Sequence, residues 1–196
     1  AGVGNPMGLD PVPVGYWKGD RAALGDQWAV PNQVSQDYVF DFATAIDYID
    51  CGAGIGTSFG DGYTGPLAIS LWFKNDIAGS GPGFDDGLFC LGTGSYGEIS
   101  AAFKNNVLNI FVSGTNRVAH PFTDTTDWHH LVINLDGSAV STSQVYLDNV
   151  PIGSTFTYDA LDLDALILYI GFYWAGVYSF DGRMSNFVIW DSALTS

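Results

Sequence analysis

The sequence has 196 residues, a hydrophobic fraction of 47%, and 21 acidic against 6 basic residues, for a formal net charge of −15. So few cations leave no basic patch for phosphate groups, which argues against nucleic acid and anionic membranes as partners. No run of eighteen apolar residues occurs, so no transmembrane helix is predicted. The chain holds 25 Gly, and Glu98 is the single Glu among acids that are otherwise Asp. Abundant Gly and Asp are typical of a many-stranded sheet protein with tight turns.

Taken in order, the chain predicts about a dozen strands and no helix. Residues 1–13 are rich in Gly and Pro and are expected to be an arm or linker before one domain at 14–196. Strands are predicted at 14–18, 37–42, 46–51, 67–74, 88–91, 98–104 and 107–113, then in a hairpin at 128–153 and a closing pair. Asn105-Asn106 is a predicted hairpin turn. Loops are predicted at 19–36, 52–66, 75–87, 114–127 and 154–165.

The closing pair is the most regular part of the pattern. An apolar strand enters the aromatic loop 172–178, and an Asp181-Gly182 turn leads into the last strand. Simple alternation predicts two faces for that strand: Met184, Asn186, Val188 and Trp190 on one, and Ser185, Phe187, Ile189 and Asp191 on the other. Both faces carry apolar residues, as expected for a strand that is covered on each side.

Two stretches carry a resemblance to a known family. They are WHHLVINLDG at 128–137 followed by VYLDNVPIG at 145–153, and DGRMSNFVIWD at 181–191. SLWFK at 70–74 and the run Asp47-Tyr48-Ile49 after Phe42 add to it. The chain resembles laminin-G-like, concanavalin A-like lectin-glucanase domains, of the kind found in marine bacteriophage and bacterial surface proteins. The resemblance covers nearly all of 14–195 and implies an all-β, two-sheet antiparallel jelly-roll sandwich.

The resemblance implies recognition more than catalysis. Retaining glucanases on this fold carry Glu-x-Asp-x-x-Glu on one strand, and a chain with a single Glu lacks that motif. We therefore expect no enzyme but a carbohydrate or cell-surface recognition module of a larger protein, located outside the cell or on a virion surface. Its partner would be a glycan or a cell-surface polysaccharide. The alternative is a decoration or appendage domain of a phage particle, which acts by assembly with other virion or surface proteins.

The aromatic loop is the predicted contact surface, because sugars stack their C–H faces on aromatic rings. Tyr173 and Trp174 lie between Gly171 and Gly176, and ligand contact, a protein interface and core packing all stay open for them. His129 and His130 are neighbours on a predicted strand, so they point to opposite faces and cannot share one metal ion. The resemblance implies a structural role for both histidines.

Calcium is the cofactor that the acidic loops suit, because carboxylates, Asn side chains and loop carbonyls are hard oxygen ligands. Laminin-G-like relatives often hold calcium at a sheet rim, and Asp159, Asp162 and Asp164 are the candidate ligands here. The other interpretation is that these acids are solvated and bind no metal. Cys51 and Cys90 are expected to be buried free thiols, although spacing alone leaves a disulfide open.

Overall fold

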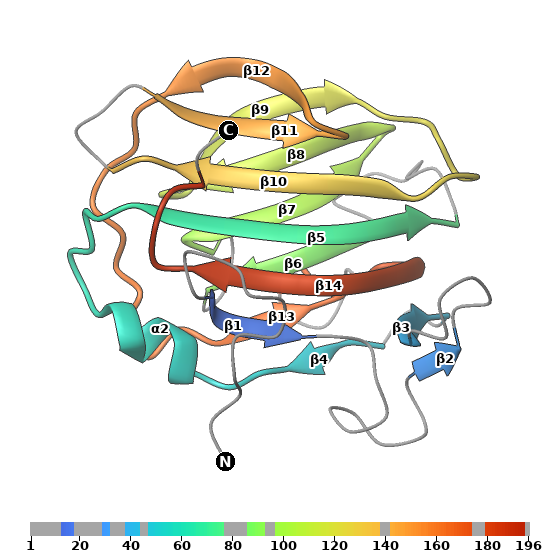
Figure 1. The fold of residues 1–196 in the computed structure, drawn as a ribbon, viewed down its shortest axis with the longest axis horizontal. Coiled ribbons are helices and arrows are strands. Elements are labelled where there is room, and N and C mark those ends of the chain that lie inside the picture. The colour runs from blue at the N-terminus through green and yellow to red at the C-terminus, as the bar shows by residue number, and fades with distance from the viewer. Residues whose placement is uncertain are drawn as a thin grey trace.

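The computed structural model describes residues 13–17, 29–31, 38–43, 47–76, 86–92, 97–137, 142–173 and 179–194, and the first two ranges and Tyr38 by their backbone alone. In these ranges two antiparallel sheets stack face to face (Figure 1). The predicted all-β sandwich is therefore confirmed. The predicted arm lies outside the described residues, apart from Pro13. No helix in the described part of the chain is long and apolar enough to cross a membrane.

The larger sheet has eight strands, in the order β12-β11-β10-β5-β14-β3-β2, with β1 beside β14. Their bounds are β1 Pro13–Trp17, β2 Ala29–Pro31, β3 Tyr38–Phe42, β5 Leu67–Asn75, β10 His129–Leu135, β11 Ser143–Leu147, β12 Val150–Phe156 and β14 Gly182–Trp190. The last strand, β14, is central. It pairs with β5 along one side and with β3 and β1 along the other.

The second sheet has six strands, in the order β4-β13-β6-β7-β8-β9. Their bounds are β4 Ile49–Asp50, β6 Asp86–Leu91, β7 Ile99–Lys104, β8 Val107–Val112, β9 Thr115–Pro121 and β13 Leu168–Ile170. Asn105 and Asn106 connect β7 to β8 with φ of 51° and 61°. This left-handed pair is the geometry of a two-residue hairpin turn, so the predicted turn is confirmed.

Three elements lie where the sequence predicts loops. Residues 54–59 form a short helix, α2 (Gly54–Phe59), which has no side-chain cap. A side chain at Gly56 would collide with the backbone of Leu163, so packing against a distant segment, and not helix propensity, accounts for this turn of helix. The other two are β2 and β9. In β9 only Val118 is buried, because an edge strand needs little apolar surface and so gives a weak alternation signal.

The alternation of β14 breaks at Asn186. This residue has φ of 50°, and the pairing of β14 with β5 shifts register between Ser185 and Val188. Such a bulge adds one residue and turns the following side chains to the opposite faces. The core therefore receives Met184, Phe187 and Ile189, while Val188 and Trp190 pack on the outer side. The predicted grouping of Met184 with Val188 and Trp190 is wrong for this reason.

The core lies between the two sheets and is built mainly from interdigitating aromatic and aliphatic side chains. The Phe73 ring of β5 lies 5.6 Å from that of Phe103 and 5.5 Å from that of Phe122. Phe187 of β14 meets Phe89 of β6 edge to face at 5.3 Å. Each contact joins the eight-stranded sheet to the six-stranded side, so these rings hold the two layers together.

Two edge strands from different sheets also lie against each other. β12 ends the eight-stranded sheet and β9 ends the six-stranded one. A side chain at Gly153 of β12 would lie 3.0 Å from Val118 of β9. The Arg117 guanidinium of β9 sits 6.0 Å from the centre of the Phe156 ring of β12. The sandwich is therefore closed along this side.

Cys51 and Cys90 are both free thiols; Cys90 is buried and Cys51 is half-buried. Burial raises the pKa of each thiol to about 12, and the charge of Asp50 adds to the effect at Cys51. Because the thiolate is the reactive form, we expect iodoacetamide at pH 8 to label the native protein slowly and the denatured protein fast. Intact-mass spectrometry over time measures both rates. Native labelling as fast as in denaturant would contradict the prediction.

Candidate functional site

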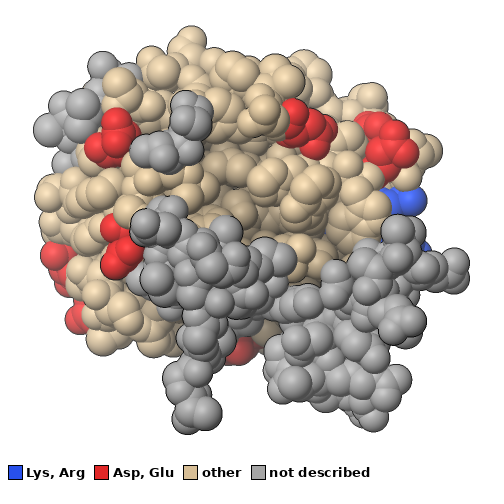
Figure 2. Space-filling model, in the orientation of Figure 1, with Lys and Arg blue, Asp and Glu red and all other residues tan. Residues whose placement is uncertain are grey.

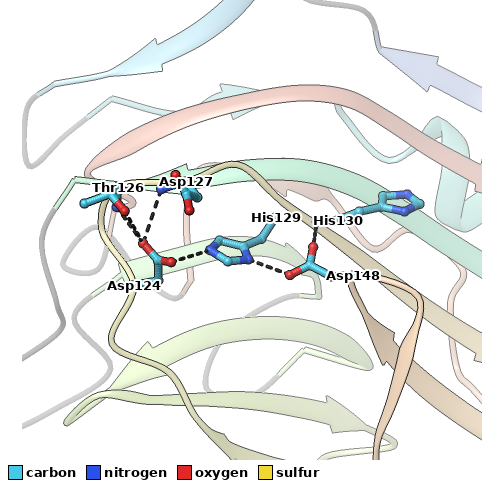
Figure 3. Close-up of polar contacts among 6 residues, drawn as sticks. All are labelled: Asp124, Thr126, Asp127, His129, His130 and Asp148. Atoms are coloured by element: carbon cyan, nitrogen blue, oxygen red, sulfur yellow. Dashed lines mark hydrogen bonds and ion pairs between the residues drawn. The ribbon is translucent and has the colours of Figure 1, made fainter.

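A polar cluster forms around His129 at the start of β10 (Figure 3). Its Nδ1 atom lies 2.7 Å from Oδ2 of Asp148, and its Nε2 atom lies 3.5 Å from Oδ2 of Asp124. The other oxygen of Asp148 accepts a hydrogen bond from the backbone N–H of His130 at 2.8 Å. The cluster thus connects the segment before β10 to the turn between β11 and β12.

Asp124 is itself held by the turn that follows it. Its Oδ1 atom accepts hydrogen bonds from the backbone N–H and the hydroxyl of Thr126, at 2.7 and 2.9 Å, and from the N–H of Asp127 at 3.2 Å. The Thr126 hydrogen bonds, with smaller help from Asp127 and His129, lower the pKa of the Asp124 carboxyl. The carboxylate is therefore ionised and fixed where it faces the imidazole.

The His129 ring is enclosed by its neighbours. Its two nitrogens face carboxylates, Nδ1 within hydrogen-bond distance of Asp148 and Nε2 in a longer ion-pair contact with Asp124. The side chain is 13% exposed and its ring contacts those of Phe73 and Phe122, with centroids 5.7 and 4.9 Å away. His130 points to the opposite face, where it stacks on Trp72, so the prediction of opposite faces is confirmed.

Tyr173, one of the two predicted ligand contacts, is completely buried at 0% exposure. It packs with Ala102 and Phe111 on the outer face of the six-stranded sheet. A side chain at Gly87 would collide with the backbone N of Tyr173, which shows how closely this residue approaches β6. Of the roles left open for Tyr173, its burial therefore favours packing over ligand contact. Trp174, the other predicted contact, lies outside the described residues.

The three predicted calcium ligands each take part in a separate hydrogen bond. Asp162 accepts a hydrogen bond from the Gly62 N–H at 3.1 Å, and Asp164 accepts one from the Ala165 N–H at 2.9 Å. At Asp159 it is the carbonyl oxygen that is engaged, by the Ser113 hydroxyl. The Asp162 and Asp164 side chains thus anchor turns. In the described ranges, three or more His, Cys, Asp or Glu side chains do not gather into a group that could hold a metal ion.

Calcium binding by the domain nevertheless stays a prediction with a direct test. A ligand at 100 times its dissociation constant stabilises the state that binds it by about 2.7 kcal/mol. If the rim loops hold calcium, chelation of a calcium-loaded sample lowers the melting temperature. Asp162→Asn should leave the difference in melting temperature between the calcium-loaded and the chelated sample unchanged, because this side chain already anchors Gly62. An unchanged melting curve in excess chelator would remove calcium as a cofactor.

Three aromatic rings cluster on the outer face of the six-stranded sheet, at its β4–β13 edge. Tyr48 lies 5.7 Å from Tyr169 and 4.9 Å from Phe172, and the latter two rings are 5.5 Å apart. Tyr48 is 43% exposed, whereas Phe172 is buried and forms the floor. We call these three residues the aromatic platform. The strands place Tyr48 and Tyr169 there because Ile49 and Ile170 pair and point inward, which turns their neighbours outward. Phe172 follows β13 after Gly171, whose φ of 78° interrupts the strand alternation.

A carboxylate lies beside the aromatic platform. Asp50 is exposed and sits opposite Tyr169 in the strand register. Its Oδ1 atom accepts a hydrogen bond from the Gly52 N–H at 2.8 Å, which fixes the carboxylate. Burial, with the charge of Asp50 and the neighbouring Tyr48, raises the pKa of Tyr169. Its hydroxyl therefore stays protonated and can donate a hydrogen bond.

The sequence did not reveal the aromatic platform. Nothing in a single sequence indicates that β4 and β13, which are far apart in the chain, become neighbours. Of the residues in the predicted aromatic loop 172–178, Phe172 belongs to the aromatic platform.

Comparison with solved structures shows the same fold in several binding domains. Domain 4 of AbnA, a GH43 extracellular arabinanase from Geobacillus stearothermophilus solved with arabinotriose, has a TM-score of 0.58 and 16% identity over 92% of this chain and 83% of that one. The receptor binding domain of botulinum neurotoxin D has a TM-score of 0.63 and 12% identity over 92% of this chain. The binding domain of Paraclostridial Mosquitocidal Protein 1 has a TM-score of 0.64 and 14% identity over 85%. This chain spans 45% and 42% of those two toxin chains.

Comparison with curated protein sequences gives no match. The family model of laminin G type, described as the concanavalin A-like lectin/glucanases superfamily, matches residues 51–196. That range holds the WHH hairpin, the SLWFK strand and the closing strand on which the resemblance rested. The chain belongs to the concanavalin A-like lectin/glucanases superfamily.

Proposed function

We propose that this domain is a non-catalytic carbohydrate-binding module that holds a sugar on the aromatic platform. The observation that carries the proposal is the exposed Tyr48 ring, supported by Tyr169 and Phe172 beside the fixed carboxylate of Asp50. A sugar ring offers an apolar C–H face for stacking and hydroxyls for the carboxylate. The platform supplies both contacts within one strand pair.

The affinity expected from such a surface is modest. A few rings and one carboxylate bury little area, so binding free energies on the order of 4–8 kcal/mol, or millimolar to micromolar dissociation constants, are expected. Modules of this strength act by holding a larger protein near a polysaccharide. We therefore place this domain in a larger protein outside the cell or on a virion surface. The extracellular arabinanase whose domain 4 was solved with arabinotriose supports that setting by analogy of fold.

Replacement of Tyr48 tests the proposal. Tyr48→Ala is expected to weaken binding to neutral glycans on an array by at least about tenfold, since ring stacking carries most of the contact. Tyr48→Phe should keep the affinity within about twofold, because the stacking face is retained. Val150→Ala is the matched control, an exposed apolar residue on the other sheet, and should change nothing. Equal melting temperatures establish that all variants are folded.

The alternative, assembly into a particle, makes the opposite prediction. A folded domain that binds no neutral glycan, or whose binding survives Tyr48→Ala unchanged, would contradict the proposal. Co-sedimentation with particles would then support assembly. Release of reducing ends from a bound polysaccharide would overturn the non-catalytic part of the proposal alone.

A further inference from the structure

Trp72 is exposed on the eight-stranded sheet, on the other side of the sandwich from the aromatic platform. It is the one exposed residue of β5, at 40% of its surface. Its neighbours Leu71 and Phe73 point into the core, so Trp72 faces outward from the eight-stranded sheet. Leaving so large an apolar ring in water is unfavourable, and the core does not require it.

A second ring holds Trp72 in place. His130 of β10 is its direct partner across the strand pair, and the two rings stack at 4.8 Å with an interplanar angle of 13°. Burial lowers the pKa of His130, against a smaller opposing effect of Asp148, so its imidazole is neutral at pH 7. A neutral imidazole offers one donor and one acceptor nitrogen. The pair is thus a rigid, uncharged aromatic surface with hydrogen-bonding capacity.

Charged residues border this pair on some sides, Asp148 beside His130 and Lys74 with its register partner Arg183 beyond Trp72, while its other neighbours are uncharged. The residue opposite Trp72 on β14 is Ser185, which has a small, uncharged side chain. Val132 and Tyr146 face each other in the adjoining strands β10 and β11, and Lys74 borders the pair as the next outward residue of β5. Figure 2 looks onto this sheet and shows a broad central area without acidic or basic side chains, although the protein carries a net charge of −15.

These features favour a neutral sugar over an anionic ligand or a second copy of the chain as the occupant of this surface. Anionic ligands are repelled by the net charge, and a second copy of the same chain carries that charge too. A flat, uncharged ring pair with a donor and an acceptor matches the C–H face and hydroxyls of a neutral sugar, as the aromatic platform does. Sheets in a sandwich stack about 10 Å apart, so one short sugar chain cannot reach both outer faces.

We propose that Trp72 and His130 form a second binding site for neutral glycans, on the face opposite the aromatic platform, so that one domain binds two glycan chains. This inference rests on the proposed function, because it assumes that the platform is the first site. It adds that the domain cross-links polysaccharide without forming a dimer.

Titration calorimetry of the whole domain with three neutral trisaccharides, arabinotriose, cellotriose and mannotriose, tests the number of sites. For a trisaccharide that binds, we expect two sites in the wild type, one in Trp72→Ala, one in Tyr48→Ala and none in the double variant. Trp72→Tyr should keep two sites, because a stacking ring is retained. The outward position of Trp72 leaves the melting temperature of these variants close to that of the wild type.

Cross-linking gives a second readout. Two sites per domain should precipitate a soluble neutral polysaccharide, while either single variant should lose precipitation and keep the dissociation constant of its remaining site within about twofold. Turbidity against protein concentration measures this loss.

The outcomes separate the two proposals. One site, lost in Tyr48→Ala and retained in Trp72→Ala, leaves the proposed function standing and overturns the second site. Binding that is lost in Trp72→Ala and retained in Tyr48→Ala would overturn the aromatic platform as a binding site and leave the Trp72 site standing. Binding of none of the three trisaccharides overturns both. Sedimentation that shows a dimer abolished by Trp72→Ala would overturn the second site by making this surface a protein contact.

Discussion

A fragment of residues 1–182, which lacks nearly all of β14, is expected to remain unfolded. β14 joins β5 to both β3 and β1, so its loss splits the eight-stranded sheet and exposes long unpaired edges. Met184, Phe187 and Ile189 are all fully buried, and each contributes about 1.5–3 kcal/mol by its burial. Their sum is comparable with the whole stability of a domain, about 5–15 kcal/mol.

Circular dichroism and urea unfolding measure the result. The matched control is a fragment of residues 1–191, which keeps β14 and loses the contacts of Leu194. These are two hydrogen bonds, of 2.8 and 3.2 Å, between the Asn134 amide and the Leu194 backbone, and packing against the cluster of Ala68, Val188 and Trp190. The control should therefore fold with a lower melting temperature. Cooperative unfolding of the 1–182 fragment would show that β14 is dispensable.

Gly171→Ala is expected to destabilise the domain by roughly 2–4 kcal/mol. Gly171 has φ of +78°, and a non-glycine residue there costs about 1 kcal/mol. The new methyl group would also collide with the buried ring of Phe42, and such overpacking adds about 1–3 kcal/mol. Gly171 cannot move aside freely, because its N–H donates to Leu88 and its carbonyl accepts from Phe180.

Gly114→Ala separates the two contributions. Gly114 has φ of +63°, but a side chain there meets nothing within 4 Å, so only the conformational cost of about 1 kcal/mol applies. For a domain of this size each kcal/mol shifts the melting temperature by about 2–4 °C. Thermal unfolding of both variants should therefore show a clearly larger shift for Gly171→Ala. Equal shifts would mean that the Phe42 ring yields without cost.

The parts of the fold that sequence predicts well are those in which local pattern and burial agree. The strand that begins at WHH alternates between buried and half-buried positions because one of its faces enters the core. SLWFK belongs to a strand that is buried at nearly every position, which its apolar run indicates. The bulge at Asn186 escapes the pattern, since nothing local distinguishes an extra residue in a strand with two apolar faces. α2 escapes it too, because Gly56 is placed by contact with Leu163 and not by helix propensity.

The sequence predicted the kind of site, a surface of aromatic rings, but not the residues that form it. Aromatic residues near the closing pair do line a surface, but exposure depends on what the rest of the chain covers. Tyr173 is buried because β6 approaches it at Gly87, a residue without a side chain. Tyr48 reaches the same surface only through the pairing of β4 with β13. Lateral strand order and close backbone approach are tertiary facts that a single sequence does not contain.

The contact between β9 and β12 bears on how this domain avoids aggregation. A free edge strand offers unpaired N–H and C=O groups to any other extended chain. Here two such edges, one from each sheet, lie against one another through Gly153 and Val118, so each hinders the approach of a foreign strand to the other. A bulky residue at Gly153, where φ is +69°, would push these edges apart. Loss of solubility at high concentration would then precede any loss of secondary structure.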